Sequence, residues 1–259
     1  MKRALLIGIN YFGQDGELRG CQEDVTHMDE WLETLGYTDI VVMKDGKFDK
    51  THSRPLAPTK DNILRELYSI VSRCKAGDSL LVHYSGHGSQ LKTTEPKNER
   101  DGKDETLCPV DYNYAKIDNG FIHDNQLHDI LVKSLPEGVK LRMVCDSCHS
   151  GSILDLPQLF YEYTCIKETF NESGKDVICI SGCRDSQTSA DATIGGSAQG
   201  AMTWSLLKAL TESKEKGEKP TWKDLIKQMR KDLKTARYSQ VPQLSCNKEE
   251  HLDLVVDLL

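Results

Sequence analysis

The chain has 259 residues, of which 38% are hydrophobic and 28% charged, and its formal net charge is −7 at pH 7. This is enough apolar material for the core of a single α/β domain, and no apolar run approaches the length of a membrane span. A nucleic-acid partner requires a basic face, whereas Lys and Arg are here scattered among Asp and Glu, so neither nucleic acid nor a membrane is an expected partner.

Six short apolar or β-branched runs, bounded by Gly, Asp or Asn, are predicted as strands. The first of them lies in MKRALLIGIN, which has no small-residue cleavage site and is therefore interpreted as a strand and not as a signal peptide. Continuous apolar character without alternation is typical of strands buried on both faces, as in a parallel sheet covered by helices. The six runs are Ala4–Ile9, Ile40–Met43, Ser79–Tyr84, Leu141–Cys145, Val177–Ser181 and Leu252–Leu258.

Amphipathic helical patterns lie between these runs. Gly36 is predicted to end the first helix, and Thr59 is predicted to cap the second. Strands that alternate with helices imply right-handed crossovers, and therefore an α/β fold in which a mostly parallel sheet lies between helical layers. The helices are expected at Asp24–Leu35, Lys60–Cys74, Asn125–Leu131, Ala201–Leu210 and Trp222–Ala236.

The segment CDSCHSG (145–151) is compatible with several kinds of site. It matches C-x-x-C-H, the attachment pattern of a c-type haem, and its first four residues match a thioredoxin-like redox pair. Nine cysteines without an export signal indicate reduced thiols in the cytoplasm or nucleus, which disfavours the haem. A zinc site requires about four ligands, and the one further C-x-x-x-C, at Cys179 and Cys183, begins inside a predicted strand. A single nucleophilic thiolate and the redox pair remain as interpretations.

A histidine follows a second predicted strand in a comparable way. His87 lies between Gly86 and Gly88 just after Ser79–Tyr84, and Cys148 lies in the turn after Leu141–Cys145. Ligands of open parallel sheets bind outside the carboxyl ends of the strands. A thiol with an ordinary pKa near ~8.5 needs a neighbouring imidazole to react at neutral pH. We therefore predict Cys148 as nucleophile and His87 as its base, with backbone N–H groups of Cys148 and Gly88 binding the oxyanion.

Cys145, the other cysteine of this segment, lies within the predicted strand. Its side chain is expected to point away from the site into the core.

Several segments of the chain together resemble the metacaspases, a family of caspase-like cysteine peptidases. HYSGHG (83–88) and DSCHSGS (146–152) are similar to the His and Cys boxes of that family. The resemblance covers nearly the whole chain, and it implies a caspase-like αβα sandwich around a mostly parallel central sheet. The further matching segments are GCQED (20–24), DETLCPVDY (104–112), ISGCRDSQTSAD (180–191) and GAMTWSLLKAL (200–210).

The resemblance is to the type I group, which implies a single peptidase domain over residues 1–259. A large-subunit-like part (1–165) would be followed by a linker (166–175) and a small-subunit-like part (176–259). The linker holds Lys167 and Lys175, and we expect self-cleavage after one of them when calcium binds. Caspases pair through a sheet edge, whereas metacaspases are generally monomeric, so a monomer is expected.

The resemblance also implies cleavage after Arg or Lys. By motif match the pocket for that side chain consists of Cys21, Asp24, Ser85 and Asp146. Two carboxylates can bind a guanidinium through paired, charge-assisted hydrogen bonds, and they would repel an acidic side chain. The alternative is that Asp24 is a first-turn aspartate that stabilises the dipole of its own helix.

Activation by Ca²⁺ is a further implication of the resemblance. The ligands map onto Asp104, Asp124, Asn125 and Asp155, and hard oxygen donors on loops suit Ca²⁺ better than zinc. Asn125 stands where relatives carry Asp, so weaker calcium binding is expected. The alternative for these residues is a solvated acidic loop face.

The expected activity is therefore that of a calcium-activated cysteine endopeptidase acting on proteins or peptides after Arg or Lys. One alternative is a peptidase-inactive or chaperone-like homologue that acts in protein quality control. The presence of both Cys148 and His87 argues against it. A second alternative is a caspase-like peptidase with specificity for Asp, which an acidic pocket disfavours.

Overall fold

The structure is a computed structural model. It describes residues 1–47, 56–92, 103–113, 120–148, 150–161, 164–167, 173–182, 191–194 and 197–258. Of the segments singled out above, His149, residues 183–190, which include Cys183, and residues 168–172 of the linker lie outside this description.

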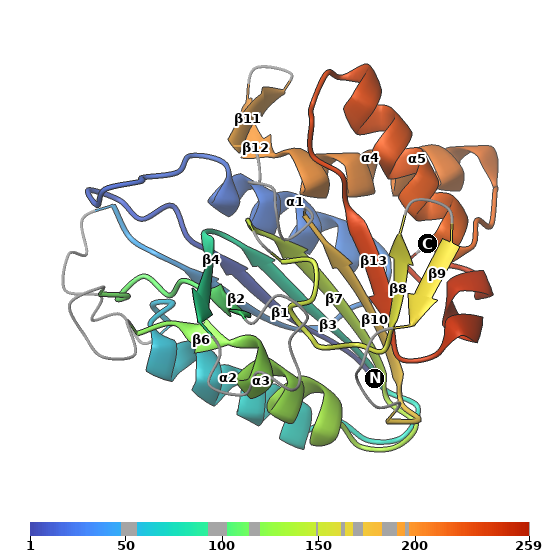
Figure 1. Ribbon diagram of the computed structural model, residues 1–259, viewed down its shortest axis with the longest axis horizontal. Coiled ribbons are helices and arrows are strands. Elements are labelled where there is room, and N and C mark those ends of the chain that lie inside the picture. Colours follow the sequence, from blue (N-terminus) through green and yellow to red (C-terminus); the bar gives the residue numbers. More distant parts are fainter. Residues whose placement is uncertain are drawn as a thin grey trace.

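An eight-stranded sheet forms the centre of the molecule, in the order β2-β1-β3-β7-β10-β13-β8-β9 (Figure 1). Its first five strands are parallel, and the last three are antiparallel to their neighbours. The parallel strands are β1 (Lys2–Gly8), β2 (Asp39–Lys44), β3 (Ser79–Ser85), β7 (Lys140–Asp146) and β10 (Asp176–Ser181). The antiparallel strands are β13 (Gln243–Cys246), β8 (Gln158–Tyr161) and β9 (Thr164–Lys167).

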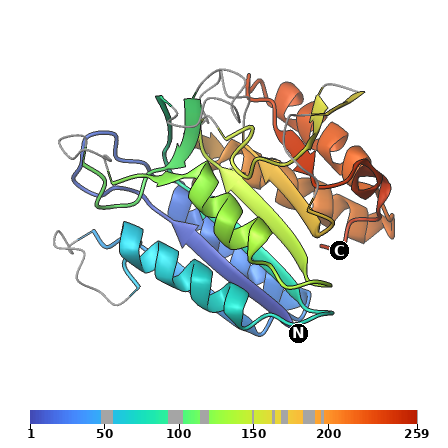
Figure 2. The same ribbon diagram turned by 60° about the horizontal axis from the view of Figure 1, so that its bottom comes forward.

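Helices cover both faces of this sheet (Figures 1 and 2). One layer holds α1 (Cys21–Thr34), α4 (Ala201–Lys216) and α5 (Trp222–Thr235). The other holds α2 (Lys60–Ser72) and α3 (Asp124–His128), which continues into the π-helical turn η1 (Asp129–Lys133). The predicted αβα sandwich around a mostly parallel sheet is therefore confirmed.

Successive residues of β1 show why the central strands are apolar throughout. Leu6 packs in the core on the side of α1, α4 and α5, and Leu5 and Ile7 pack in the core on the side of α2 and α3. Because alternate side chains of a strand point to opposite faces, a sheet covered on both faces needs apolar residues at every position.

Two small β units lie beyond the carboxyl ends of the parallel strands. A three-stranded sheet consists of β4 (Gly88–Lys92), β5 (Lys103–Leu107) and β6 (Ile122–His123), and a hairpin consists of β11 (Asp191–Ile194) and β12 (Ser197–Gly200). β4 begins three residues after β3 ends, and β12 leads directly into α4. Both units therefore border the predicted catalytic edge.

The helix predictions are confirmed, with ends shifted by a few residues. The Thr59 hydroxyl accepts a hydrogen bond from the N–H of Asn62 and caps α2. Gly36 has a φ of +78°, the left-handed conformation that glycine adopts after the end of a helix.

The last predicted strand is wrong. Residues 252–258 contain the end of a 3₁₀ helix, η2 (Glu249–Asp253), and then irregular chain with an isolated bridge between Thr221 and Val255. The apolar side chains of Leu252, Val256 and Leu258 are buried without a strand. Asp257 is turned to Arg142, with two hydrogen bonds of 2.9 and 2.8 Å.

The large-subunit-like and small-subunit-like parts share the central sheet. β10 pairs with β7, and β13 pairs with β8, so strands of the two parts interleave. The boundary between the parts stays a prediction.

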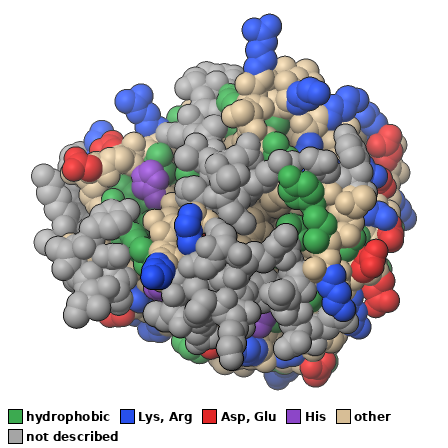
Figure 3. All heavy atoms as spheres, in the orientation of Figure 1, with side chains coloured by type: hydrophobic (Ala, Val, Ile, Leu, Met, Phe, Trp, Pro, Cys, Tyr) green, Lys and Arg blue, Asp and Glu red, His purple; other side chains and the backbone are tan. Residues whose placement is uncertain are grey.

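The surface carries charges of both signs. Figure 3 shows Lys and Arg side chains around the rim of one face with Asp and Glu side chains between them. Of the helices described, none combines the length and apolar character that a membrane crossing requires.

Candidate active site

The predicted nucleophile and base follow two neighbouring strands. β3 and β7 pair in parallel, with Ser85 opposite Asp146, and the Gly86 N–H donates to the Asp146 carbonyl at 3.3 Å. A methyl group at Gly88 would overlap the carbonyl oxygen of Cys148, so glycine is needed for this close approach. His87, between the two glycines, and Cys148 therefore lie at the same edge of the sheet.

The turn that carries Cys148 is held by hydrogen bonds from a neighbouring serine. The Ser150 hydroxyl donates to the Ser147 carbonyl at 2.9 Å and accepts from the Gly182 N–H at 3.2 Å. Gly182 directly follows β10, so the turn is tied to the next strand of the sheet. Cys148 itself is partly exposed, as a nucleophile must be to meet a substrate.

One ring nitrogen of His87 contacts a carbonyl. Nε2 lies 2.6 Å from the carbonyl oxygen of Gly16, in the loop between β1 and α1. A carbonyl only accepts hydrogen bonds, so Nε2 carries the proton. The neutral ring therefore has its basic nitrogen at Nδ1, and the Gly16 carbonyl stabilises the ring when it becomes charged.

Two buried tyrosines hold the backbone of His87. The Tyr11 hydroxyl accepts from the His87 N–H at 2.9 Å, and the Tyr84 hydroxyl donates to the His87 carbonyl at 2.8 Å. The rings of Tyr11 and His87 lie 4.6 Å apart between centroids. Burial raises the pKa of both phenols well above the usual value, so both hydroxyls stay protonated. Tyr11 adopts a φ of +54°, a strained conformation for this residue type.

The other cysteines of this region are buried thiols. Cys145 is fully buried and packs in the core on the α2 side, as predicted, which disfavours its pairing with Cys148. Burial, with a smaller effect of nearby Cys148, raises the pKa of Cys108 to about 12. No disulfide joins any of the eight cysteines in the described part of the chain.

The residues predicted to bind a basic side chain converge on the other face of the sheet. The Ser85 hydroxyl donates to Asp24 Oδ2 at 2.6 Å, and the Gly200 N–H donates to Asp24 Oδ1 at 2.8 Å. A methyl group at Gly200 would overlap the carboxylates of both Asp24 and Asp146. Asp24 is 1% exposed and Asp146 is 3% exposed, so both carboxylates are buried.

Cys21 lies at the start of α1, one turn before Asp24, and is 6% exposed. A Cβ at Gly8 would lie 2.5 Å from the Cys21 carbonyl oxygen, so the glycine at the end of β1 lets α1 begin against the sheet. The hydrogen bonds of the Asp24 carboxylate described above lead to β3 and to the start of α4. Asp24 therefore has partners beyond its own helix, and its role in a substrate pocket stays a prediction.

A second acidic cluster lies on the α3 side of the site. Burial first, and then the charges of Glu105 and Asp104, raise the pKa of Asp155 to about 7. Asp104 Oδ1 and Asp155 Oδ1 are buried and have no hydrogen-bond partner. Asp104 Oδ2 contacts His123 Nδ1 at 3.0 Å. Because Asp104 and Asp155 are buried, the alternative of a solvated acidic loop face is wrong for these two residues.

The other two predicted calcium ligands begin α3. The Asp124 carboxylate accepts from the N–H groups of Glu105 and Asn125, at 2.5 and 2.6 Å, and so links β5 to α3. Asp124 is fully buried, whereas Asn125 is partly exposed. Within the described ranges, no three His, Cys, Asp or Glu side chains are already arranged to hold a metal ion.

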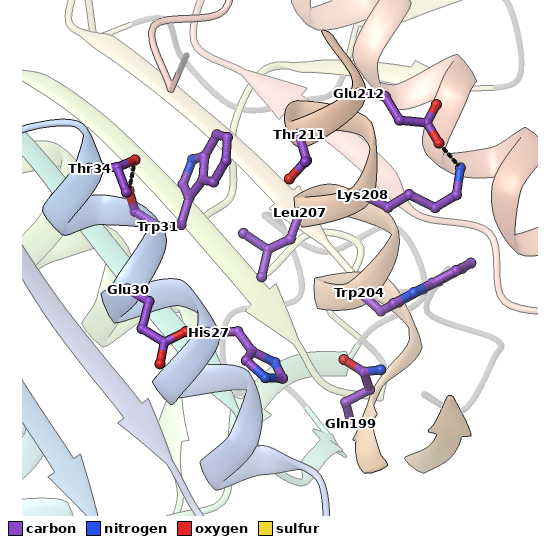
Figure 4. A pocket seen from close by; sticks show the side chains of 10 residues that line it. All are labelled: His27, Glu30, Trp31, Thr34, Gln199, Trp204, Leu207, Lys208, Thr211 and Glu212. Carbon is purple, nitrogen blue, oxygen red and sulfur yellow. Dashed lines mark hydrogen bonds and ion pairs between the residues drawn. The ribbon is translucent and has the colours of Figure 1, made fainter. Parts of the chain in front are cut away.

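A groove lies between α1 and α4. It has a volume of about 460 Å³, and Figure 4 shows Trp31, Leu207 and Trp204 along it. His27, one turn after Asp24, and Gln199, next to Gly200, lie at one end of it (Figure 4).

Comparisons with known proteins identify the family of the chain. Residues 2–157 match the family model described as the metacaspase, peptidase C14 domain. The chain is 38% identical to Metacaspase-1 of Ajellomyces capsulatus over 98% of this chain and 82% of that protein. It is 37% identical to Metacaspase-1 of Mycosarcoma maydis over 98% and 72% of the two chains.

Two solved structures share the fold. A Geobacter sulfurreducens protein has a TM-score of 0.67 at 22% identity, covering 98% of this chain and 97% of that one. Caspase-1 of Spodoptera frugiperda has a TM-score of 0.61 at 14% identity, covering 94% and 85%. The family match and the identity to curated metacaspases over nearly the whole chain lead to one conclusion: the chain belongs to the metacaspase family of cysteine peptidases.

Proposed function

We propose that this protein is a calcium-activated cysteine endopeptidase that cleaves after Arg or Lys, with Cys148 as nucleophile and His87 as base. The observation that supports this most strongly is the position of Cys148 and His87 just after two neighbouring strands, β7 and β3. The last residue of β7, Asp146, is one of two buried carboxylates that meet at Gly200, and the other belongs to Asp24. One edge of the sheet thus combines a nucleophile, a base and an anionic pocket.

The dyad performs acyl transfer in two stages. His87 Nδ1 takes the proton of the Cys148 thiol, and the thiolate attacks the carbonyl carbon of the scissile peptide bond. N–H groups of Cys148 and Gly88 bind the oxyanion. The imidazolium, held through Nε2 by the Gly16 carbonyl, gives its proton to the leaving amine, and a thioester remains. Water then hydrolyses the thioester, with His87 as base, and regenerates the thiol.

Specificity follows from the charge of the pocket. A guanidinium or ammonium group at the cleavage position would pair with Asp24 and Asp146, and burial strengthens this attraction by excluding water. An Asp side chain at the same position would be repelled. Hydrolysis of fluorogenic peptides ending in Arg, Lys or Asp, with and without calcium, tests the proposal. Cleavage of the Asp peptide alone, or of none, would overturn it.

Calcium would be held by oxygens of Asp104, Asp124, Asn125 and Asp155. The fit rests on the two buried carboxylate oxygens without hydrogen-bond partners, which belong to Asp104 and Asp155. Calcium takes about 6–8 oxygen ligands, including amide and backbone carbonyl oxygens, so these two would be part of the site. The ion supplies positive charge that offsets the repulsion around β5. β5 pairs with β4, whose first residue is Gly88. The proposed calcium site and the catalytic edge are therefore joined by one small sheet.

Asp155→Asn is expected to stabilise the calcium-free protein at neutral pH. The native pKa of Asp155, about 7, lies above the ordinary value of 3.8, so the folded protein loses stability as the pH rises from about 4 through 7. The loss is roughly 2–5 kcal/mol at pH 8. Thermal melting at pH 5 and pH 8 should show a pH-dependent Tm in the wild type that the variant largely lacks, and calcium should raise the wild-type Tm more than the Tm of the variant.

Glu137→Gln, which neutralises an exposed carboxylate, is the matched control and should behave like the wild type. If the Tm of Asp155→Asn fell at pH 8, or rose with calcium as far as the wild-type Tm does, the proposed role of Asp155 would be refuted.

Self-cleavage is expected after Lys167 in preference to Lys175. Lys167 is exposed at the end of the edge strand β9. Lys175 Nζ donates to the Lys133 carbonyl at 2.6 Å, and the Lys175 carbonyl accepts from Asn247 Nδ2 at 2.9 Å. Mass spectrometry of calcium-treated protein should therefore find a cut after Lys167 that is absent in Lys167→Ala and Cys148→Ala. A cut after Lys175 instead, or an intact chain with full activity, would contradict this.

A monomer in the cytosol is the proposed state of the protein. The hairpin of β8 and β9 covers the edge of β13, and the edge strand on this side, β9, has four residues and ends in a lysine. The eight described cysteines, none of them in a disulfide, are typical of a reducing compartment.

A further inference from the structure

A buried chain of hydrogen bonds ends on one of the pocket carboxylates. Thr203, in the first turn of α4, donates to Asp146 Oδ2 through its backbone N–H at 2.9 Å and through its hydroxyl at 3.0 Å. Behind it, His83 Nε2 lies 3.3 Å from the Thr203 hydroxyl oxygen. His83 is 0% exposed and Thr203 is 1% exposed.

The chemistry of the three groups fixes the direction of these bonds. The Asp146 carboxylate only accepts, so the single hydroxyl hydrogen of Thr203 is used there. The Thr203 oxygen then accepts from His83, which must carry its proton on Nε2. Burial lowers the pKa of His83 to about 3, so the ring stays neutral and keeps this proton at physiological pH.

A packing role alone does not explain His83. Its Nδ1 is buried without a hydrogen-bond partner, an unfavourable state that an apolar side chain of similar size would avoid. His83 and Ser85 lie two residues apart on β3 and face the same side of the sheet. That side also holds Asp24 and the start of α4, so His83 lies beneath the pocket.

The start of α4 is built around the two pocket carboxylates. Gly200, the N-cap residue of α4, offers no side-chain cap, and its N–H donates to Asp24. Asp146 accepts from Thr203 three residues later, where a capping side chain would normally accept. The start of α4 thus positions both carboxylates, one through Gly200 and the other through Thr203.

We propose that Thr203, supported by His83, is a specificity-determining positioning residue that fixes the orientation of the Asp146 carboxylate toward a basic side chain of the substrate. This rests on the proposed function of Asp146 in the pocket. A guanidinium requires a carboxylate in a defined plane for paired hydrogen bonds, whereas an ammonium acts as a compact point charge. Loss of the Thr203 hydroxyl should therefore weaken the binding of Arg substrates more than the binding of Lys substrates.

Thr203→Val, which removes the hydroxyl and keeps the shape, is the central test. KM for an arginyl reporter should rise about tenfold or more, as for the loss of a hydrogen bond to a charged group, and the Arg-to-Lys ratio of kcat/KM should fall. The rate at which iodoacetamide alkylates Cys148 should stay unchanged, because the dyad is untouched. Thr203→Ser restores the hydroxyl and should restore the ratio. Thr211→Val, at an exposed position of α4, is the matched control.

The outcomes separate this inference from the proposed function. A wild-type protein that hydrolyses neither the arginyl nor the lysyl reporter contradicts the proposed function. A wild type that hydrolyses both, with a Thr203→Val variant of wild-type KM and wild-type Arg-to-Lys ratio, overturns the inference alone. If melting shows that Thr203→Val is unfolded, Thr203→Ala decides, since it lacks the hydroxyl and keeps the backbone N–H. The inference requires that the Arg-to-Lys ratio of kcat/KM falls in Thr203→Ala as well.

Discussion

His87→Ala should lower kcat/KM for an arginyl peptide by about 10³-fold or more, within the range expected when a general base is lost. The structure prepares this ring in three ways: the Gly16 carbonyl fixes its tautomer, the Tyr11 ring packs against it, and two tyrosine hydroxyls hold its backbone. Loss of this prepared ring should therefore leave little activity.

The pH dependence of Cys148 alkylation provides a second readout of the same variant. In the wild type, His87 should make the thiolate available at neutral pH. In His87→Ala the thiol should react as an ordinary cysteine, with an apparent pKa near ~8.5. His27→Ala changes a histidine of the α1–α4 groove and serves as the control. If His87→Ala cleaved peptides at the wild-type rate, His87 would not be the base.

Asp24→Asn should lower kcat/KM for arginyl and lysyl peptides by about 10²-fold or more, because it removes one partner of a buried charge pair. The change is nearly isosteric. The Asn oxygen can accept from the Gly200 N–H, and its amide can donate to the Ser85 hydroxyl, so the hydrogen bonds at 2.8 and 2.6 Å have replacements. Folding should therefore be largely retained while the attraction for a cation falls.

The measurement is steady-state kinetics with a melting curve for each variant. Glu23→Gln is the control, since it neutralises the neighbouring first-turn acid of α1, which is exposed. A lower Tm in Asp24→Asn with unchanged peptide kinetics would instead support the alternative of an aspartate that stabilises its helix.

The placement of His87 and Cys148 at one edge of the sheet could be predicted because it depends on short-range order along the chain. Ser79–Tyr84 and Leu141–Cys145 are apolar enough to be recognised as buried strands, and the polar residues that follow them must emerge at the carboxyl edge of a parallel sheet. The strands also prove to be neighbours, which brings His87 and Cys148 together. The position of Cys145 within the predicted strand correctly indicated that its side chain lies in the core.

The supporting residues depend on contacts between distant segments. Tyr11 is 76 residues from His87, and Thr203 is 120 residues from His83. Tyr11 does follow the first predicted strand, so the rule that led to His87 would also have placed it at this edge. Nothing in the local pattern around Thr203 indicates that its hydroxyl meets Asp146, because the register of α4 against the sheet decides that contact.

The end of the chain shows how apolar content alone misleads. Gln243–Cys246 has polar residues at two of its four positions, yet it is buried between β10 and β8 and forms a central strand. Leu252–Leu258 is richer in leucine and valine but is not a strand, because Asp257 turns toward Arg142 while the apolar residues pack irregularly. Whether a segment becomes a strand is decided here by the strands available to pair with it, and not by its composition.

Labelling by an arginyl chloromethyl ketone, followed by mass spectrometry of the peptides, tests the central assignment most directly. The reagent carries the basic side chain into the acidic pocket and alkylates the nucleophile beside it. We predict one adduct, on Cys148, which is lost in Cys148→Ala and strongly slowed in both His87→Ala and Asp24→Asn. An adduct on another cysteine, or equally fast labelling by the aspartyl reagent, would contradict the account.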